Sequence, residues 1–150
     1  MKTILIAVFV ALTSFTNPLA AERFAAAAVK NIQTYDVPTL LEQESSLLGQ
    51  IVAVRFQYRS ARLRHLRPRW YEASIWHHES KLKKGRTALR VMVDKKDVPA
   101  FQTITSDAQS TAEVTLYALV QKDLDYDLVH LRILGRKITT DDAGNAVIDW

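Results

Sequence analysis

At QIVAVRFQYR, residues 50–59, the hydrophobic pattern changes from a helical period to strict alternation. Apolar side chains occupy every second position here: Val52, Val54, Phe56 and Tyr58. Successive side chains of a strand point to opposite faces of a sheet, so this pattern predicts a strand with one face buried. The chain therefore changes from helix to sheet near residue 50.

Downstream, the two-residue period returns in four runs, at residues 70–78, 87–93, 113–121 and 128–138. Between the second and third runs, residues 97–102 combine an N-cap Asp, an early Pro and a Phe, which predicts a short helix. Gly135 indicates a bend or bulge in the last run. From residue 49 onward we expect a mainly β domain: three strands, a short helix, two strands, and a final short run at residues 147–150.

Upstream of the first strand the sequence favours helix. Residues 22–33 are rich in Ala, and a second helix is predicted at about residues 37–48, with Asp36 as N-cap, Pro38 in its first turn and Gly49 at its end. We therefore divide the chain into a signal peptide at 1–20, an N-terminal helical segment at 21–48 and a β domain at 49–150.

The first twenty residues have the layout of a secretory signal peptide. A positive residue precedes an apolar run at residues 4–12, followed by a polar segment and small residues. The run is too short to span a bilayer, which needs about 20 apolar residues. We predict cleavage near Ala20 or Ala21, with residues 25–28 as a later alternative, and a periplasmic or secreted mature protein.

Length and composition limit the remaining possibilities. The chain has 150 residues, 48% of them hydrophobic, with few Gly and Pro, which is typical of one globular domain and excludes wholly disordered or collagen-like chains. It has no Cys, which excludes disulfides, thiolate metal sites and a cysteine nucleophile.

Positive charge is concentrated in the middle of the sequence. Residues 50–96 contain 13 Lys and Arg against three Asp and Glu, so the rest of the mature chain is acidic. Such a surface attracts anions and favours a polyanionic partner: nucleic acid, anionic lipid or acidic envelope glycan. The alternative is a solvated charged surface that keeps a small exported domain soluble.

The most unusual segment is RSARLRHLRPR at residues 59–69, which we interpret as a loop joining the first and second strands. Arginine presents a planar fork suited to phosphate, and tryptophan on an adjoining strand can stack on bases or sugars. Parity places the tryptophans on the outer face of residues 70–78; in the alternative they are core, and Ala73 and Ile75 face outward. The predicted binding residues are Arg59, Arg62, Arg64, Arg67, Arg69, Trp70, Trp76 and Arg90.

The sequence predicts neither a metal site nor a cofactor. Adjacent residues of a strand face opposite sides, so the His pair at residues 77–78 cannot easily bind one ion. The alternating Asp residues at 123–127 lack the Gly and distal Glu of a calcium loop and indicate a hairpin turn. No nucleophile elbow or phosphate-binding glycine loop is present, so we expect a non-enzymatic protein.

The order of elements over residues 49–150 resembles the five-stranded oligonucleotide/oligosaccharide-binding fold (OB-fold). The resemblance implies a partly open barrel in which the connection between the first and second strands is one of the loops that frame the ligand face, and we expect the positive face to extend from the first to the third strand. The alternatives are an unrelated α+β sheet or a small antiparallel sandwich. In size and charge the chain is also similar to staphylococcal-type thermonucleases, but residues 94–99, DKKDVP, lack their carboxylate cluster.

Two functions follow as hypotheses. The first is a polyanion-binding module that uses the basic, tryptophan-bearing face. The second is a protein-interaction or envelope-assembly module in which an exposed strand edge pairs with a partner. In the second case the Ala-rich helix and residues 147–150 would be docking elements.

Overall fold

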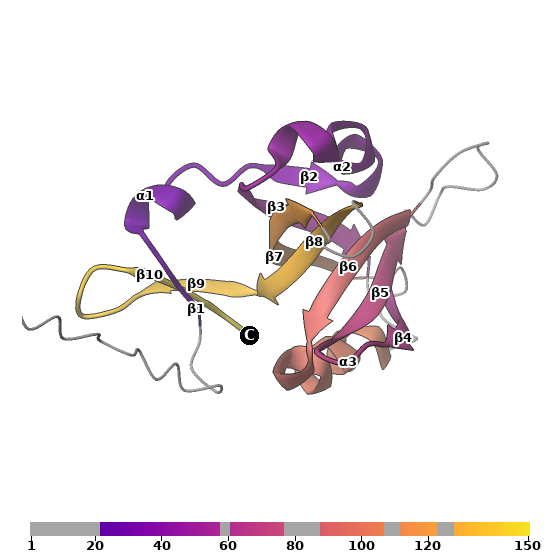
Figure 1. Ribbon diagram of the computed structural model, residues 1–150. Coiled ribbons are helices and arrows are strands. Elements are labelled where there is room, and N and C mark those ends of the chain that lie inside the picture. The colour runs from indigo at the N-terminus through magenta and orange to yellow at the C-terminus, as the bar shows by residue number, and fades with distance from the viewer. Residues whose placement is uncertain (1–21, 58–60, 77–87, 107–111, 123–127) are drawn as a thin grey trace, which may run out of the picture.

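A computed structural model of the protein describes residues 22–57, 61–76, 88–106, 112–122 and 128–150. Two sheets and a few short helices make up this part of the chain (Figure 1). The mainly β architecture predicted from the alternating runs is therefore confirmed.

The predicted signal peptide lies outside the described residues, as do Arg59, the His pair at 77–78 and the Asp residues at 123–127.

The larger sheet has seven strands in the order β2-β3-β7-β8-β6-β5-β4. Neighbours are antiparallel except for the pairs β2/β3 and β6/β8, which are parallel. In this spatial order the strands are Thr34–Asp36, Ile51–Gln57, Glu113–Lys122, Val129–Gly135, Ala88–Asp94, Trp70–Trp76 and Ala61–Leu66.

Chain connectivity forces this sheet to curl. Gln57 at the end of β3 and Ala61 at the start of β4 are four residues apart, which limits the distance between their Cα atoms to about 14 Å. In a flat sheet, five strand spacings would separate β3 from β4 by about 24 Å. The sheet is therefore barrel-like, but within the described ranges no ladder joins its terminal strands, β2 and β4, so it is not closed.

The inner face of the curled sheet is the main core. The alternating positions predicted for the core are buried there, including Val54, Leu116, Ala118 and Leu131. Two helices cover opposite ends of the sheet (Figure 1). The helix α3, Val98–Ser106, buries three side chains one turn apart, which confirms the short helix expected after the third predicted strand: Val98, Phe101 and Ile104.

The second covering helix, α2 at Val37–Gln43, begins where the sequence predicted. The backbone N–H of Thr39 donates to the Asp36 carboxylate at 2.9 Å, which caps the helix, and Pro38 lies in its first turn. A 3-10 turn, η1 at Glu44–Leu47, continues the helix. Gly49 follows with φ +80°, a conformation that favours glycine, and ends it.

A small three-stranded sheet, β1-β10-β9, projects from one side of the larger sheet (Figure 1). Its strands are Glu22–Phe24, Ala146–Asp149 and Lys137–Thr140. Ile148 packs with Ile51 and Leu134 in a second, smaller core. Gly135 makes the predicted bend between β8 and β9, with φ +156°, and any Cβ there would overlap the backbone of Asp149.

Three local expectations need correction. The segment 22–33 is not one helix: β1 pairs with β10, and only α1, Ala26–Val29, is helical. The alanines do form helix, as their propensity predicts, but Glu22, Arg23 and Phe24 before them pair with β10 instead. Residues 61–66 are not a loop but the strand β4, whose apolar Ala61 and Leu63 alternate with arginines and pack toward the core.

The third correction concerns residues 147–150, which do not have the docking role that the second hypothesis gives them. Ala146 and Ile148 are buried, and Trp150 packs against the main core with its ring 6.5 Å from that of Phe101. Residues 147–150 therefore stabilise the fold itself and do not form a free docking element.

Candidate functional site

The outer face of β5 carries the tryptophans. Ala73 and Ile75 are fully buried on the inner face, so Trp70 and Trp76 lie on the opposite face, where both are partly exposed. This is the orientation that the alternation of residues 70–78 predicts. The two tryptophans are six positions apart on one strand, which places their Cα atoms about 20 Å apart.

Two arginines flank the Trp76 end of the strand. In the sheet register Arg62 on β4 lies opposite Ser74 on β5, which lies opposite Arg90 on β6. Both arginines are exposed, and Ser74 between them is buried. We call Arg62, Ser74, Trp76 and Arg90 the basic end of β5.

The Arg62 guanidinium lies over the indole of Trp76, with its carbon 5.5 Å from the ring centroid. This is a cation–π contact, which holds the cation close to the ring while its N–H donors stay exposed to solvent. A flat ring and two cations thus share one solvent-facing surface. Such a surface can stack on a base or sugar and bind adjacent phosphates or carboxylates.

The Trp70 end of β5 has a different environment. The Trp70 ring lies 6.2 Å from the ring of His130, at an interplanar angle of 57°, and His130 is buried. The Gln121 amide donates to the sulfur of Met92 at 3.7 Å, linking strands β7 and β6 across the same outer face. Trp70 therefore contacts a buried ring on β8, two strands away in the sheet.

Charges at this second end are paired. Arg67 contacts Glu72 at 3.3 Å, and Arg132 contacts Asp94, the register partner of Trp70, at 2.9 Å. We call Arg67, Trp70, Glu72, Asp94, His130 and Arg132 the balanced end of β5. Opposite charges this close cancel at longer range, so Arg67 and Arg132 attract a polyanion less than the exposed Arg62 and Arg90 do.

The predicted binding residues therefore separate into groups. Arg62, Trp76 and Arg90 are brought together, while Arg67 and Trp70 belong to the balanced end. Arg64 is exposed at an irregularity in the β4 ladder between Leu63 and His65, and Arg69 is exposed in the turn before β5. Arg59 lies outside the described residues.

Sequence reasoning missed Arg132. This side chain bridges Glu22 on β1 and Asp94 on β6, at 2.8 Å and 2.9 Å. Burial lowers its pKa, but the hydrogen bonds and charges of Asp94 and Glu22 outweigh burial and raise it, so the guanidinium stays ionised. The three residues are far apart in sequence, and no local pattern joins them.

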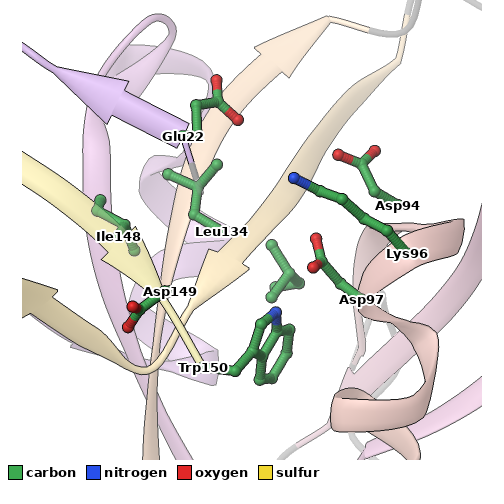
Figure 2. A pocket seen from close by; sticks show the side chains of 9 residues that line it. Glu22, Asp94, Lys96, Asp97, Leu134, Ile148, Asp149 and Trp150 are labelled. Atoms are coloured by element: carbon green, nitrogen blue, oxygen red, sulfur yellow. The ribbon is translucent and has the colours of Figure 1, made fainter. Parts of the chain in front are cut away.

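A separate cavity of ≈ 170 Å³ lies beside this bridge, between the two sheets and the 3-10 turn η3, Lys95–Asp97 (Figure 2). Its floor is apolar, formed by Ile133, Leu134 and Ile148 with the Trp150 indole, and charged side chains surround it. Within the described part of the chain, no group of three or more His, Asp or Glu is placed to hold a metal ion.

Comparison with known proteins places the chain in no family. No protein-family model matches it, and no curated protein matches it. Among solved structures, it is similar to a "putative nucleic acid-binding lipoprotein" from Klebsiella pneumoniae, at 18% identity and TM-score 0.47, over 73% of this chain and 94% of that one. It is also similar to a "putative aspartyl-tRNA synthetase" from Leishmania major, at 17% identity and TM-score 0.39, over 77% of this chain and 22% of that one.

Among the residues that the structure describes, no helix has the length and apolar character needed to cross a membrane.

Proposed function

We propose that this protein is an exported, non-enzymatic binding module with an OB-like barrel, and that the basic end of β5 binds a single-stranded polyanion carrying flat rings. Single-stranded nucleic acid is the ligand class that such a surface suits best. Acidic envelope glycans and anionic lipid head groups share the charge, but a lipid head group offers no ring for Trp76 to stack on.

The strand order supports the OB-like assignment. If β3 and β4 are two halves of one long first strand, then β5, β6, β7 and β8 are the second to fifth strands, with α3 between the third and fourth. The first strand then pairs with both the second and the fourth, which curls the sheet on itself. In this fold the second and third strands form the ligand face, and these are the strands that carry Trp76 and Arg90.

The observation that supports polyanion binding most directly is the Arg62–Trp76 contact beside Arg90. Arginine can donate two parallel hydrogen bonds to a phosphate, and the exposed part of an indole can stack on a base whatever its sequence. Because the Arg62 guanidinium already lies over the Trp76 ring, part of its side-chain freedom is lost before a ligand binds.

A titration of the mature chain tests this function. Tryptophan emission is followed while a single-stranded oligonucleotide of about eight nucleotides, a duplex of the same sequence or an acidic glycan is added, at about 50 and 200 mM salt. We expect the single strand to bind most tightly and to lose affinity steeply as salt rises. Equal affinity for all three ligands, or affinity independent of salt, would contradict the proposal.

A protein-interaction module is the second candidate, because of the edge of the larger sheet. Within the described ranges β4 pairs only with β5, and Leu66 on it is 60% exposed. An unpaired edge can accept a partner's strand, although irregular pairing and exposed arginines on β4 are features that protect edges from such pairing. Salt-insensitive co-purification of a defined partner that is lost in Leu66→Lys would favour this candidate.

A further inference from the structure

Trp76 has an arginine at the diagonal position on each side of it. Ser74, two residues before Trp76 on β5, is the register partner of both Arg62 on β4 and Arg90 on β6. Diagonal neighbours on one face of a sheet are about 7–8 Å apart, within reach of aromatic and long side chains. Arg90 is therefore related to Trp76 as Arg62 is, but from the opposite side.

The Arg62 guanidinium occupies one face of the indole. Its carbon lies 5.5 Å from the ring centroid, and the side chain reaches the ring from β4. An indole has two faces, and a planar ligand group needs one of them to stack on. Because Arg62 comes from the β4 side, we expect a ligand to use the face on the β6 side.

Small side chains lie next to Trp76 on that side. Its register partner on β6 is Ala88, which keeps part of its surface exposed, so the indole does not cover it completely. Ser74 is buried, and Arg90, two residues after Ala88, is exposed. The larger side chains of Trp76 and Arg90 thus flank Ala88. We call the place over Ala88, between these two side chains, the stacking position.

We propose that the basic end of β5 binds one unpaired base at the stacking position, between the Trp76 indole and the Arg90 guanidinium. The inference rests on the proposed function and adds which part of the ligand the site recognises. Bases of single strands stack on aromatic rings and on guanidinium planes. The N–H donors of a guanidinium lie in its plane, so Arg90 can stack on the base and still bind a phosphate. Arg62 keeps the other face of the indole.

A base held between two planar groups defines the ligand class more narrowly. Inside a duplex both faces of a base are covered by its neighbours, and exposing them costs unstacking and unpairing energy, so a single strand is favoured. A purine has the larger ring system and covers more of the indole than a pyrimidine does. Preferences of this kind come from stacking strength. The expected ligand is therefore a single strand that contains a purine.

Ala88→Leu tests the stacking position by filling it without changing the charge of the site. Calorimetric titration compares two strands of about eight nucleotides, one of thymidine only and one with a single central adenine, at about 50 mM salt. The parent chain should bind the adenine strand about three- to tenfold more tightly. In Ala88→Leu we expect this preference to disappear. The matched control, Thr115→Leu, enlarges a partly exposed side chain on the outer face of β7 and should keep the preference.

A pair of conservative variants tests the role of Arg90 without altering the fold or the charge. Arg90→Lys keeps the cation but removes the planar group, so it should reduce the preference for adenine to less than about twofold. Arg62→Lys makes the same change on the other side of the indole and should keep the preference. If Arg62→Lys removes the preference and Arg90→Lys does not, the base stacks on the β4 side and the inference is wrong.

The same titrations distinguish failure of this inference from failure of the proposed function. A parent chain that binds both strands equally, with affinity that falls as salt rises, would overturn the inference and leave the proposed function intact. An adenine preference that survives in Ala88→Leu would do the same. A parent chain that binds neither strand would overturn both.

Discussion

The two ends of β5 present the same side chain in opposite electrostatic surroundings. At the basic end, Trp76 lies under the Arg62 guanidinium and beside the exposed Arg90. At the balanced end, Trp70 packs against His130, and Arg67 and Arg132 are paired with Glu72 and Asp94. An exposed aromatic ring thus becomes a candidate binding site only where its neighbouring cations remain available to a ligand.

The two tryptophans of β5 should also differ in their contributions to fold stability and to ligand binding. Trp70 links strands through its contact with His130, so its loss should weaken the fold. Trp76 is partly exposed and contacts the Arg62 guanidinium, so we expect its loss to weaken ligand binding more than the fold.

Reversing both charges of the basic end should have the largest effect. In the double variant Arg62→Glu/Arg90→Glu we expect single-strand affinity to fall by about 100-fold or more at about 50 mM salt, because two phosphate contacts become repulsions. Fluorescence anisotropy of a labelled oligonucleotide measures the loss. The matched control, Lys30→Glu/Lys137→Glu, changes the net charge equally at exposed positions away from β5. An equal loss in the control would mean that net charge alone drives binding.

Alanine substitution of each tryptophan should separate the two ends. Stacking on one base contributes about 1–3 kcal/mol, so Trp76→Ala should weaken binding by about tenfold or more and leave the unfolding midpoint nearly unchanged. Trp70→Ala should reduce stability by about 1–3 kcal/mol, because it removes packed apolar area, and change affinity by less than about twofold. The reverse pattern in parallel titrations and denaturant unfolding would exchange the roles of the two ends.

Releasing Arg67 should make the balanced end more basic. Glu72→Gln removes the negative partner of Arg67 while keeping the shape of the side chain. We expect affinity for a single strand to rise about two- to threefold and the slope of log affinity against log salt to steepen by less than one, as for one added phosphate contact. Gln121→Glu places a negative charge on the same outer face, so it should lower the affinity for a single strand. A Glu72→Gln chain that binds no more tightly would show that the ligand does not reach this end.

Much of the sheet could be predicted because alternation is a local signal. The alternation of Ala73 and Ile75 with Trp70 and Trp76 predicted which side chains of β5 face outward, and the residue type of Gly135 predicted the bend there. The strand β4 was missed because its arginines and the nearby Pro68 resemble a loop, while its apolar positions are only Ala61, Leu63 and the exposed Leu66. Three-residue strands such as β1 and β2 depend almost entirely on their partners.

The division between the two ends of β5 could not be predicted from sequence. Arg62 and Arg90 are 28 positions apart and meet only through Ser74, which pairs with both. Nothing in the sequence distinguishes Arg67 and Arg132 from Arg62. Only the tertiary structure pairs Arg67 with Glu72, and Arg132 with Glu22 and Asp94. The cavity beside η3 likewise combines residues from both ends of the chain.

The most direct test uses Trp76 as the sole tryptophan. The chain has three tryptophans, so Trp70→Phe/Trp150→Phe leaves only Trp76 to report. Titration with a single strand of about eight nucleotides should change its emission, and the change should require a higher ligand concentration as salt rises from about 50 to 200 mM. If anisotropy shows that the oligonucleotide binds while Trp76 emission stays constant, the basic end of β5 is not the binding site.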